Sequence, residues 1–537
     1  MRRSRFVAMT KRLSLVILVV LIASPTLGLA PKYGGELTLR LREDLPQGFA
    51  IHETATISTM WPAMPCFSNL VLFDPLKSTH RVDAIIGELA EKWSWQENYR
   101  NLVFFLRKGV KWHDGQPFTA KDVKFTFDML REVPDASARL RINPRKDWYA
   151  NVESIETPDT YTAVFRLKKP QPSLLLMLAS GYTPIYAAHV PPASYRTGCV
   201  GTGPFKLKEW RKGEFVQYMK NTDYFVMGRP YLSGLRYLII GDRGTATAAL
   251  QAGRVDTAFP GQTPKPIAER LKKAVPDFVM TTVNTSVIDH LVINTKKPPF
   301  DNAKVRLALS RAIDRRAMIE AVYQGGAVLG ASMASPPFGL WGLLDKDIRT
   351  LPGNGKAADE KAKARTLLAE AGFGPNTPLR LEMLTRALPD FLDMASFVTN
   401  ELKQVGIETS LRQVESAQWH PLLTRGDFQV GLERTGIEPD DPDANFYENY
   451  GCASPRNYAR YCDEVVAKLI DQQSQELDRA KRLALVQEIQ RRLETAAIRP
   501  VLVWRLDYFA QWPHVKNLVP HHSLYSWGRM QDVWLDR

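Results

Sequence analysis

Residues 107–128, RKGVKWHDGQPFTAKDVKFTFD, constrain the fold more tightly than any other stretch of the chain. An apolar run at 104–106 predicts a strand that leads into them. The Asp114-Gly115 pair predicts a hairpin turn, because glycine tolerates positive φ and aspartate can hydrogen-bond its own backbone. Thr119 lies three residues before Asp122, ahead of an apolar segment, which is the capping-box signature of a helix start. We therefore expect a strand, a tight turn and a capped helix in direct succession.

The same stretch places His113 beside Asp114, a pair that resembles part of a catalytic site. Adjacent residues on a hairpin point to opposite faces, so we interpret the pair as structural. The chain lacks H-E-x-x-H, G-x-S-x-G and G-x-x-x-x-G-K-[ST], and Gly201-Thr202-Gly203 is followed by Pro204, which suits a turn into a strand and not a phosphate loop. We therefore expect a protein that is not an enzyme and that needs no cofactor.

The first 30 residues have the three-part layout of a secretion signal. Five basic residues accompany an apolar run at 13–23, and Gly28 and Ala30 are small residues that suit a cleavage site. Pro31 directly after Ala30 leaves the exact site open, and an uncleaved anchor is the alternative. No cysteine lies near the cleavage region to carry a lipid, so we expect a soluble periplasmic protein whose signal is removed.

The charge of the chain excludes few partners by itself. The formal net charge is +14, and the first 30 residues hold five basic and no acidic residues, so 14 less 5 leaves +9 for the rest. The charges are interspersed, and no dense basic tract alternates with aromatic residues. A nucleic-acid surface needs such a tract, so we expect no nucleic-acid partner. A basic surface still favours acidic ligands or an anionic membrane face.

Strand-like and helix-like segments alternate along the chain, which predicts sheets covered by helices and an α/β fold. We expect strands at 33–42, 161–167, 203–210, 213–220, 290–294, 379–384, 407–414 and 501–508, and helices at 66–73, 305–323, 357–371, 390–405, 462–473 and 477–495. No internal repeat is present, and no interior run is apolar and long enough to span a bilayer.

The opening stretch also carries a family resemblance. It fits the pattern G-V-x-[WF]-x-D-G-x-P-[FL]-T-A-x-D-V-x-[FY] and resembles the extracellular solute-binding proteins of family 5, the peptide, dipeptide and nickel class that serves ABC importers. Further landmarks follow in the order that the family shows: GTGPF at 201–205, NTKKPPFDNAKVR at 294–306, AID at 312–314, AEAGF at 369–373 and the Asp441-Pro442 pair. The resemblance covers nearly the whole chain after the signal.

This resemblance implies a two-lobed periplasmic binding protein of the large type, type II-like, with mixed sheets flanked by helices and an extra subdomain. We expect a signal peptide at 1–30, a discontinuous first lobe at 31–72, 200–285 and 506–537, an extra subdomain at 73–199 and a second lobe at 286–505. The chain then crosses between the lobes near 285 and near 505. Such crossings form a hinge, and closure around a ligand is the expected motion.

The resemblance also indicates where a ligand binds. In peptide-binding members, the first carboxylate of an acidic turn holds the α-ammonium of the peptide. Alignment through Phe428 and Pro442 places Glu438 at that position, one methylene longer than the usual aspartate. A charge-assisted contact of this kind in a closed cleft leaves the rest of the ligand free to vary. Thr435 replaces a tryptophan of some peptide binders, and Glu438-Pro439 replaces their D-Y.

Four neighbouring residues complete the candidate ligand site. Trp419 would supply an apolar wall, Asp440 and Asp441 are further carboxylates of the turn, and Arg434 would pair with a ligand carboxylate. The alternative is that the acidic residues form a solvated turn and that Trp419 belongs to the core.

Four cysteines remain, all beyond the signal, and an exported protein with an even number permits disulfides. Cys452 and Cys462 enclose a polar loop, and similar proteins of the family carry a local bridge near this point; Cys66 with Cys199 is then the remaining pair by elimination. The cysteines form no C-x-x-C, and His514, His521 and His522 lack the paired helical spacing of metal ligands, so we expect no metal site.

The sequence therefore predicts the periplasmic binding component of an ABC importer. It would capture a peptide or peptide-like solute between two lobes, deliver it to the membrane permease and act as a monomer. The alternatives are a nickel chelate, an opine or an oligosaccharide as ligand of the same fold, or an exported hydrolase or a sensor on a similar scaffold.

Overall fold

The computed structural model describes residues 30–537, so the predicted signal peptide lies, apart from its last residue, outside the described part of the chain. The opening stretch has the expected form. β5 (Asn101–Leu106) leads to a turn in which Gly115 has φ of 92°, and α2 (Ala120–Leu130) follows. Thr119 caps that helix, and its backbone N–H donates to Asp122 Oδ2 at 2.8 Å, which completes the capping box. The local prediction is confirmed.

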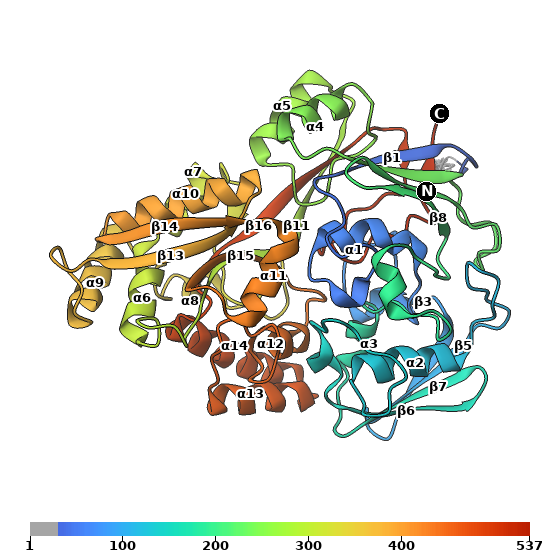
Figure 1. Cartoon of the computed structure of the whole chain (residues 1–537), viewed down its shortest axis with the longest axis horizontal. Coiled ribbons are helices and arrows are strands. Elements are labelled where there is room, and N and C mark those ends of the chain that lie inside the picture. Colours follow the sequence, from blue (N-terminus) through green and yellow to red (C-terminus); the bar gives the residue numbers. More distant parts are fainter. Residues whose placement is uncertain (1–29) are drawn as a thin grey trace, which may run out of the picture. The chain divides into compact units, whose positions relative to one another are not determined.

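One mixed sheet of four strands has the order β1-β10-β9-β8. Its strands are β1 (Glu36–Leu41), β8 (Phe205–Arg211), β9 (Phe215–Lys220) and β10 (Gly234–Ile239), and only β1 and β10 are parallel. α1 (Ile57–Ala63), α4 (Arg243–Gln251) and α5 (Lys265–Ala274) belong to the same part of the molecule. Residues from both chain ends share its apolar core, from Leu37 to Phe73 and from Phe509 to Leu535 (Figure 1).

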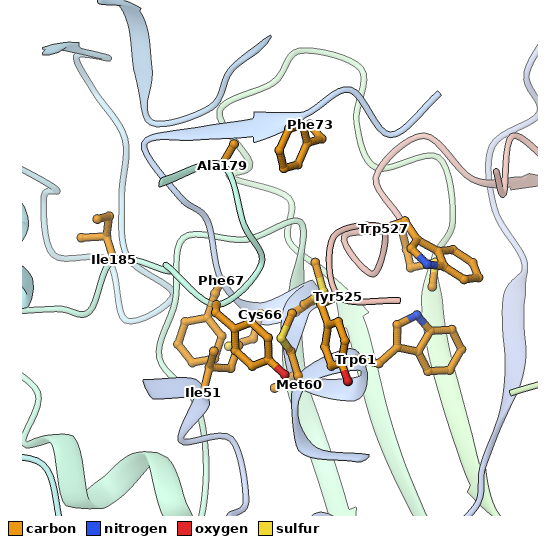
Figure 2. Packing of buried hydrophobic residues seen from close by; sticks show 14 of the residues in the cluster. Ile51, Met60, Trp61, Cys66, Phe67, Phe73, Ala179, Ile185, Tyr525 and Trp527 are labelled. Carbon is orange, nitrogen blue, oxygen red and sulfur yellow. The ribbon is translucent and has the colours of Figure 1, made fainter. Parts of the chain in front are cut away.

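A second four-stranded sheet, β4-β5-β7-β6, lies within 73–199. It is antiparallel throughout and contains β4 (Ala90–Gln96), β6 (Val152–Asp159) and β7 (Thr162–Leu167) beside β5. α2 packs on it through residues such as Phe127, whose ring lies 4.8 Å from that of Phe165. The apolar cluster of this sheet is continuous with that of the first sheet, and Figure 2 shows part of the shared cluster, including Phe67, Ala179 and Ile185.

A six-stranded mixed sheet has the order β12-β16-β11-β15-β13-β14. Its strands are β11 (Val279–Ile293), β12 (Ala327–Val328), β13 (Leu379–Arg386), β14 (Ile407–Val414), β15 (Val430–Gly436) and β16 (Val501–Gln511). Side chains of one strand alternate between two apolar clusters, as the pleat requires. In β11, Leu291 and Ile293 enter one cluster, and Ile288 and Val292 enter the other.

Helices cover both faces of this sheet (Figure 1). On the face of Leu291 lie α6 (Ala303–Ala312), α9 (Ala357–Glu370) and α10 (Pro389–Lys403); on the face of Ile288 lie α11 (Ser416–Arg425), α12 (Pro442–Tyr450), α13 (Glu464–Gln475) and α14 (Arg479–Ala496). The predicted α/β class with helix-covered sheets is therefore confirmed. No helix within 30–537 is long and apolar enough to cross a membrane.

The longest strand pair connects the regions of the four- and six-stranded sheets. β11 and β16 are antiparallel, and their register shifts between Asn284 and Ile288, where Ser286 has φ of 50°. Single β-bridges join Thr257 to Leu39 of β1 and to Gln511 of β16. This irregular, two-stranded connection spans the positions near 285 and 505 at which the sequence predicts a hinge.

Two predicted helices were wrong in part. Residues 66–73 form no helix: a short 3₁₀ turn ends at Cys66, and β2 (Val71–Phe73) pairs with β3 (Ile85–Gly87). The predicted helix at 305–323 is two helices, because Ile313 is extended and the Asp314 side chain accepts hydrogen bonds from the backbone of α7 (Arg315–Ala321). Local capping by an aspartate restarts the helix in a new direction.

Both pairs of cysteines are bonded in the structure. The Sγ atoms of Cys452 and Cys462 lie 2.05 Å apart, and those of Cys66 and Cys199 lie 2.16 Å apart. The first bridge closes a short loop after α12, and the second connects segments 133 residues apart.

Candidate functional site

An enclosed cavity of about 30 Å³ lies between segments that belong to the four-stranded and six-stranded sheet regions. The first region contributes Arg42, the segment 55–57, the loop 260–262 and Leu524 and Tyr525; the second contributes Val287, Arg386, Phe391, Trp419, His420, Arg434 and Arg505. This volume holds about one or two waters, whereas ligand sites commonly measure roughly 300 Å³ or more. As it stands, the cavity therefore has no room for a peptide.

Four arginines line this cavity, and two of them, Arg434 and Arg505, share Asp289 as an acidic partner. Arg434 Nε donates to Asp289 Oδ1 at 2.6 Å, and the same guanidinium pairs with Asp390. Arg505 donates to the carbonyl of Gly261 at 3.0 Å and lies 3.6 Å from Asp289. Burial opposes the charge of Asp390, but the neighbouring guanidinium groups, Arg434 first among them, hold its pKa well below the usual value. These two arginines are committed to the protein.

Arg42 is held in a different way. Its Nε donates to Ser58 Oγ at 3.1 Å and lies 3.3 Å from Glu43 Oε1. Glu43 and the next residues line a second, open cavity of about 350 Å³ with Arg196, Trp210 and Ser416. The Arg42–Glu43 pair thus separates the enclosed cavity from a larger one that opens to solvent.

Arg386 is the exception among the four. It is the last residue of β13, only 5% of its surface is exposed, and its guanidinium lies 5.4 Å from the ring centre of Phe391. Its Nε and Nη2 atoms have no hydrogen-bond partner among residues 30–537. Burial lowers the pKa of Arg386 to about 10, so the group still carries its charge at neutral pH. A buried guanidinium with open N–H groups is suited to a planar anion such as a carboxylate.

Two of the sequence-predicted site residues line the cavity. Trp419 is 1% exposed and lies on α11, where it also belongs to an apolar cluster of the six-stranded sheet. Arg434 lies on β15 and is paired as described above. The structure brings both together with Arg386 and Phe391.

The acidic turn lies just beyond β15, outside the residues that line this cavity. Glu438 is buried beside Ser526, which donates to it, and His80, whose Nδ1 is 3.7 Å away. Burial raises the pKa of Glu438 well above its ordinary value, which favours the neutral carboxyl. Contact between Glu438 and a ligand stays a prediction.

The two aspartates of the turn have protein partners. Asp440 Oδ2 accepts a hydrogen bond from the backbone of Leu340 at 2.9 Å, and burial raises its pKa to about 7. Asp441 caps α12 and pairs with Arg482 at 2.7 Å. Ligand contact by these two residues also stays a prediction.

Sequence reasoning missed Arg42, Arg386 and Arg505. The sequence carried a signal for Arg386 alone. Ligands of α/β sheets bind at the carboxyl ends of strands, and Arg386 lies two residues beyond the end of the strand predicted at 379–384. The histidines near the C-terminus form hydrogen bonds within the protein: His521 to His80 at 3.0 Å and His514 to Asp256 at 2.8 Å. No group of three possible metal ligands occurs within residues 30–537.

Comparison with known proteins now identifies the family. The model of the bacterial extracellular solute-binding proteins, family 5, matches residues 84–457. The chain is 28% identical over 503 residues to Di/tripeptide-binding protein 2 of Pseudomonas aeruginosa (strain UCBPP-PA14), which covers 89% of this chain and 90% of that one. It is 28% identical over 477 residues to the dipeptide-binding protein of Escherichia coli (strain K12), with coverage of 83% and 85%.

Solved structures give the same result for the fold. The periplasmic binding protein DppA of Helicobacter pylori, in complex with the peptide STSA, has a TM-score of 0.83 at 23% identity and covers 94% of this chain and 99% of its own. The oligopeptide-binding protein AppA of Bacillus subtilis, in complex with a nonapeptide, has a TM-score of 0.81 at 23% identity, with coverage of 95% and 100%. The expected two-lobed fold is confirmed, and the chain belongs to family 5 of the bacterial extracellular solute-binding proteins.

Proposed function

We propose that this protein captures a small peptide or peptide-like solute with a free carboxylate and passes it to the membrane subunits of an ABC importer. The solute binds between the lobes, and no bond of the solute is made or broken. The protein works as a monomer in the periplasm after removal of its signal, without a cofactor and without nucleic acid. Lobe boundaries at 31–72, 200–285 and 506–537, at 73–199, and at 286–505 are part of this proposal.

The open guanidinium of Arg386 is the observation that carries the proposal. A buried guanidinium whose N–H groups lack hydrogen-bond partners is costly to a folded protein, and a ligand that accepts from those groups would offset the cost. The carboxylate of the solute would accept from the Nε and Nη2 atoms that have no partner within residues 30–537. The relatives are named as di/tripeptide-binding and dipeptide-binding proteins, which supports a peptide-like solute.

Opening of the lobes is required for this function because the closed cavity is far smaller than a peptide. β11 and β16 supply the flexible connection, since their register is broken near Ser286 and only two strands cross there. Loop 260–262 and Arg505 meet at the cavity, so motion about this connection changes the site directly.

Titration calorimetry of ligand-free protein with matched dipeptides tests the proposal. Each dipeptide is compared with its C-terminal amide, which has the same size and shape and lacks the carboxylate charge. We expect the free acids to bind about 100-fold more tightly, which corresponds to roughly 2.7 kcal/mol for a charged bidentate contact. Equal affinity of acid and amide would overturn the carboxylate site.

Glu438 is our proposed partner for an ammonium group of the solute. Burial raises its pKa and favours the neutral carboxyl, so we expect Glu438 to lose a proton when an ammonium binds. Affinity for an amine-bearing peptide should then rise with pH, and calorimetry in two buffers of different ionisation enthalpy should detect release of about one proton. Glu438→Gln should remove the proton release, and an unchanged signal in that variant would exclude the role.

A further inference from the structure

Tyr525 lines the enclosed cavity from the C-terminal coil and belongs to the apolar cluster of the first lobe. Figure 2 shows it with Trp527 of the same coil and with Met60 and Trp61 of α1. Its side chain is buried, and its ring centre lies 5.1 Å from that of Tyr182. The ring is therefore held on the first-lobe side of the cavity by apolar and aromatic contacts.

The other side of the Tyr525 ring touches the last residue of β15. A Cβ atom added to Gly436 would lie 2.0 Å from Cε2 of Tyr525 and 2.5 Å from its hydroxyl oxygen. The backbone of Gly436 is not left-handed. Glycine is therefore required here by the close approach of the Tyr525 ring and not by the backbone conformation. Tyr525 and Gly436 thus bring the two lobes into contact beside the cavity.

Packing, and no side-chain hydrogen bond within residues 30–537, holds the Tyr525 ring in place. Arg434 and Arg505 have acidic or carbonyl partners, and Phe391 lies between guanidinium groups. The hydrogen bond that Tyr525 makes within residues 30–537 is from its backbone N–H to Ser523 Oγ at 3.3 Å, and none from its hydroxyl is present. Its coil has no regular secondary structure between 519 and 529.

We propose that Tyr525 is a specificity-determining residue that limits the size of the bound solute by packing on Gly436 when the lobes close. The inference rests on the proposed function and adds the solute class: compact carboxylates of about dipeptide size. The contact between the ring and Gly436 sets how closely the lobes approach beside the cavity, and a longer solute would keep the ring and Gly436 apart.

The test is a calorimetric series of alanine peptides with two, three and four residues. Wild-type protein should prefer the dipeptide, and Tyr525→Ala should shift the ratio of tripeptide to dipeptide affinity by about tenfold toward the tripeptide, equivalent to ~1.4 kcal/mol. Trp527→Phe, a change in the same coil at a residue that does not line the cavity, should leave the ratio as it is. An unchanged ratio in Tyr525→Ala would overturn the inference.

A double-mutant cycle tests the contact itself. Gly436→Ala should weaken dipeptide binding by at least tenfold, because its Cβ overlaps the Tyr525 ring in the closed state. In the Tyr525→Ala background the same change should have little effect. Additive effects would exclude the contact, and circular dichroism establishes that each variant is folded. Failure of the proposed function would look different, since wild-type protein would then bind no free-acid peptide at all.

Discussion

Replacing Arg386 by methionine should abolish the preference for free carboxylates and at the same time stabilise the ligand-free protein. The loss of a charged, bidentate contact should weaken binding of free-acid dipeptides by about 100- to 1000-fold, or roughly 3–4 kcal/mol. The methionine removes a buried charge whose Nε and Nη2 atoms have no partner within residues 30–537, and its apolar stem packs on Phe391. We expect the free energy of unfolding to rise by about 1–3 kcal/mol.

Arg434→Met is the matched control, because Arg434 lines the same cavity and differs in having acidic partners. Its removal leaves Asp390 buried without its ion-pair partner and Asp289 with Arg505 as its remaining one, which should destabilise the protein by about 3–5 kcal/mol. Urea unfolding with and without peptide separates the two effects. Destabilisation by Arg386→Met, with peptide affinity retained, would show that Arg386 is a structural residue.

Asp443→Ala should destabilise the protein as strongly as Arg434→Met. Asp443 lies in the first turn of α12, is fully buried, and accepts hydrogen bonds from Gln171 and Ser173 on one side and from Gln473 and Ser474 on the other. Arg482 lies 3.5 Å away. Alanine leaves these donors buried without an acceptor, so we expect a loss of about 3–5 kcal/mol in the free energy of unfolding.

The Asp443 contacts also connect the subdomain sheet region to α12 and α13 through polar groups, whereas that region shares an apolar core with the first lobe. Asp427→Ala is the control: Asp427 is exposed and lies 3.4 Å from Arg412, so its loss should change stability by less than about 0.5 kcal/mol. Denaturant titration followed by tryptophan fluorescence measures both variants. A cost below 1 kcal/mol for Asp443→Ala, as an approximate threshold for a buried acceptor, would contradict this account.

The elements that sequence predicted well are those whose signals are local. The capping box at Thr119 and the Gly115 turn depend on neighbours within a few residues, and both are present. The restart of a helix at Asp314 was also a local signal, and the continuous apolar pattern at 305–323 concealed it. Residues 66–73 are apolar enough for either a helix or a strand, and pairing with β3 decides the outcome.

The cavity could be predicted only in part, because its character depends on which charges remain unpaired. Arg434 and Arg386 look alike in sequence, but Asp289 and Asp390 neutralise the first and no carboxylate is hydrogen-bonded to the second within residues 30–537. The surroundings of Glu438 depend in the same way on Ser526 and His80, which come from distant parts of the chain. The sequence pattern places a carboxylate in the turn, and only its burial in the folded protein raises the pKa of that carboxyl.

The region of the β1-β10-β9-β8 sheet is built from both ends of the described chain, and this affects the order in which the protein can fold. β1 lies near the described N-terminus, yet its core includes Val533 and Leu535, and Lys32 pairs with Asp536 at 2.7 Å. All strands of the six-stranded sheet lie between 279 and 511. During synthesis, this sheet therefore has all its strands before the residues after 511 are made. During synthesis, β1 therefore lacks part of its apolar core until Val533 and Leu535 have been made. Shortening the chain at its C-terminus would expose apolar side chains of β1.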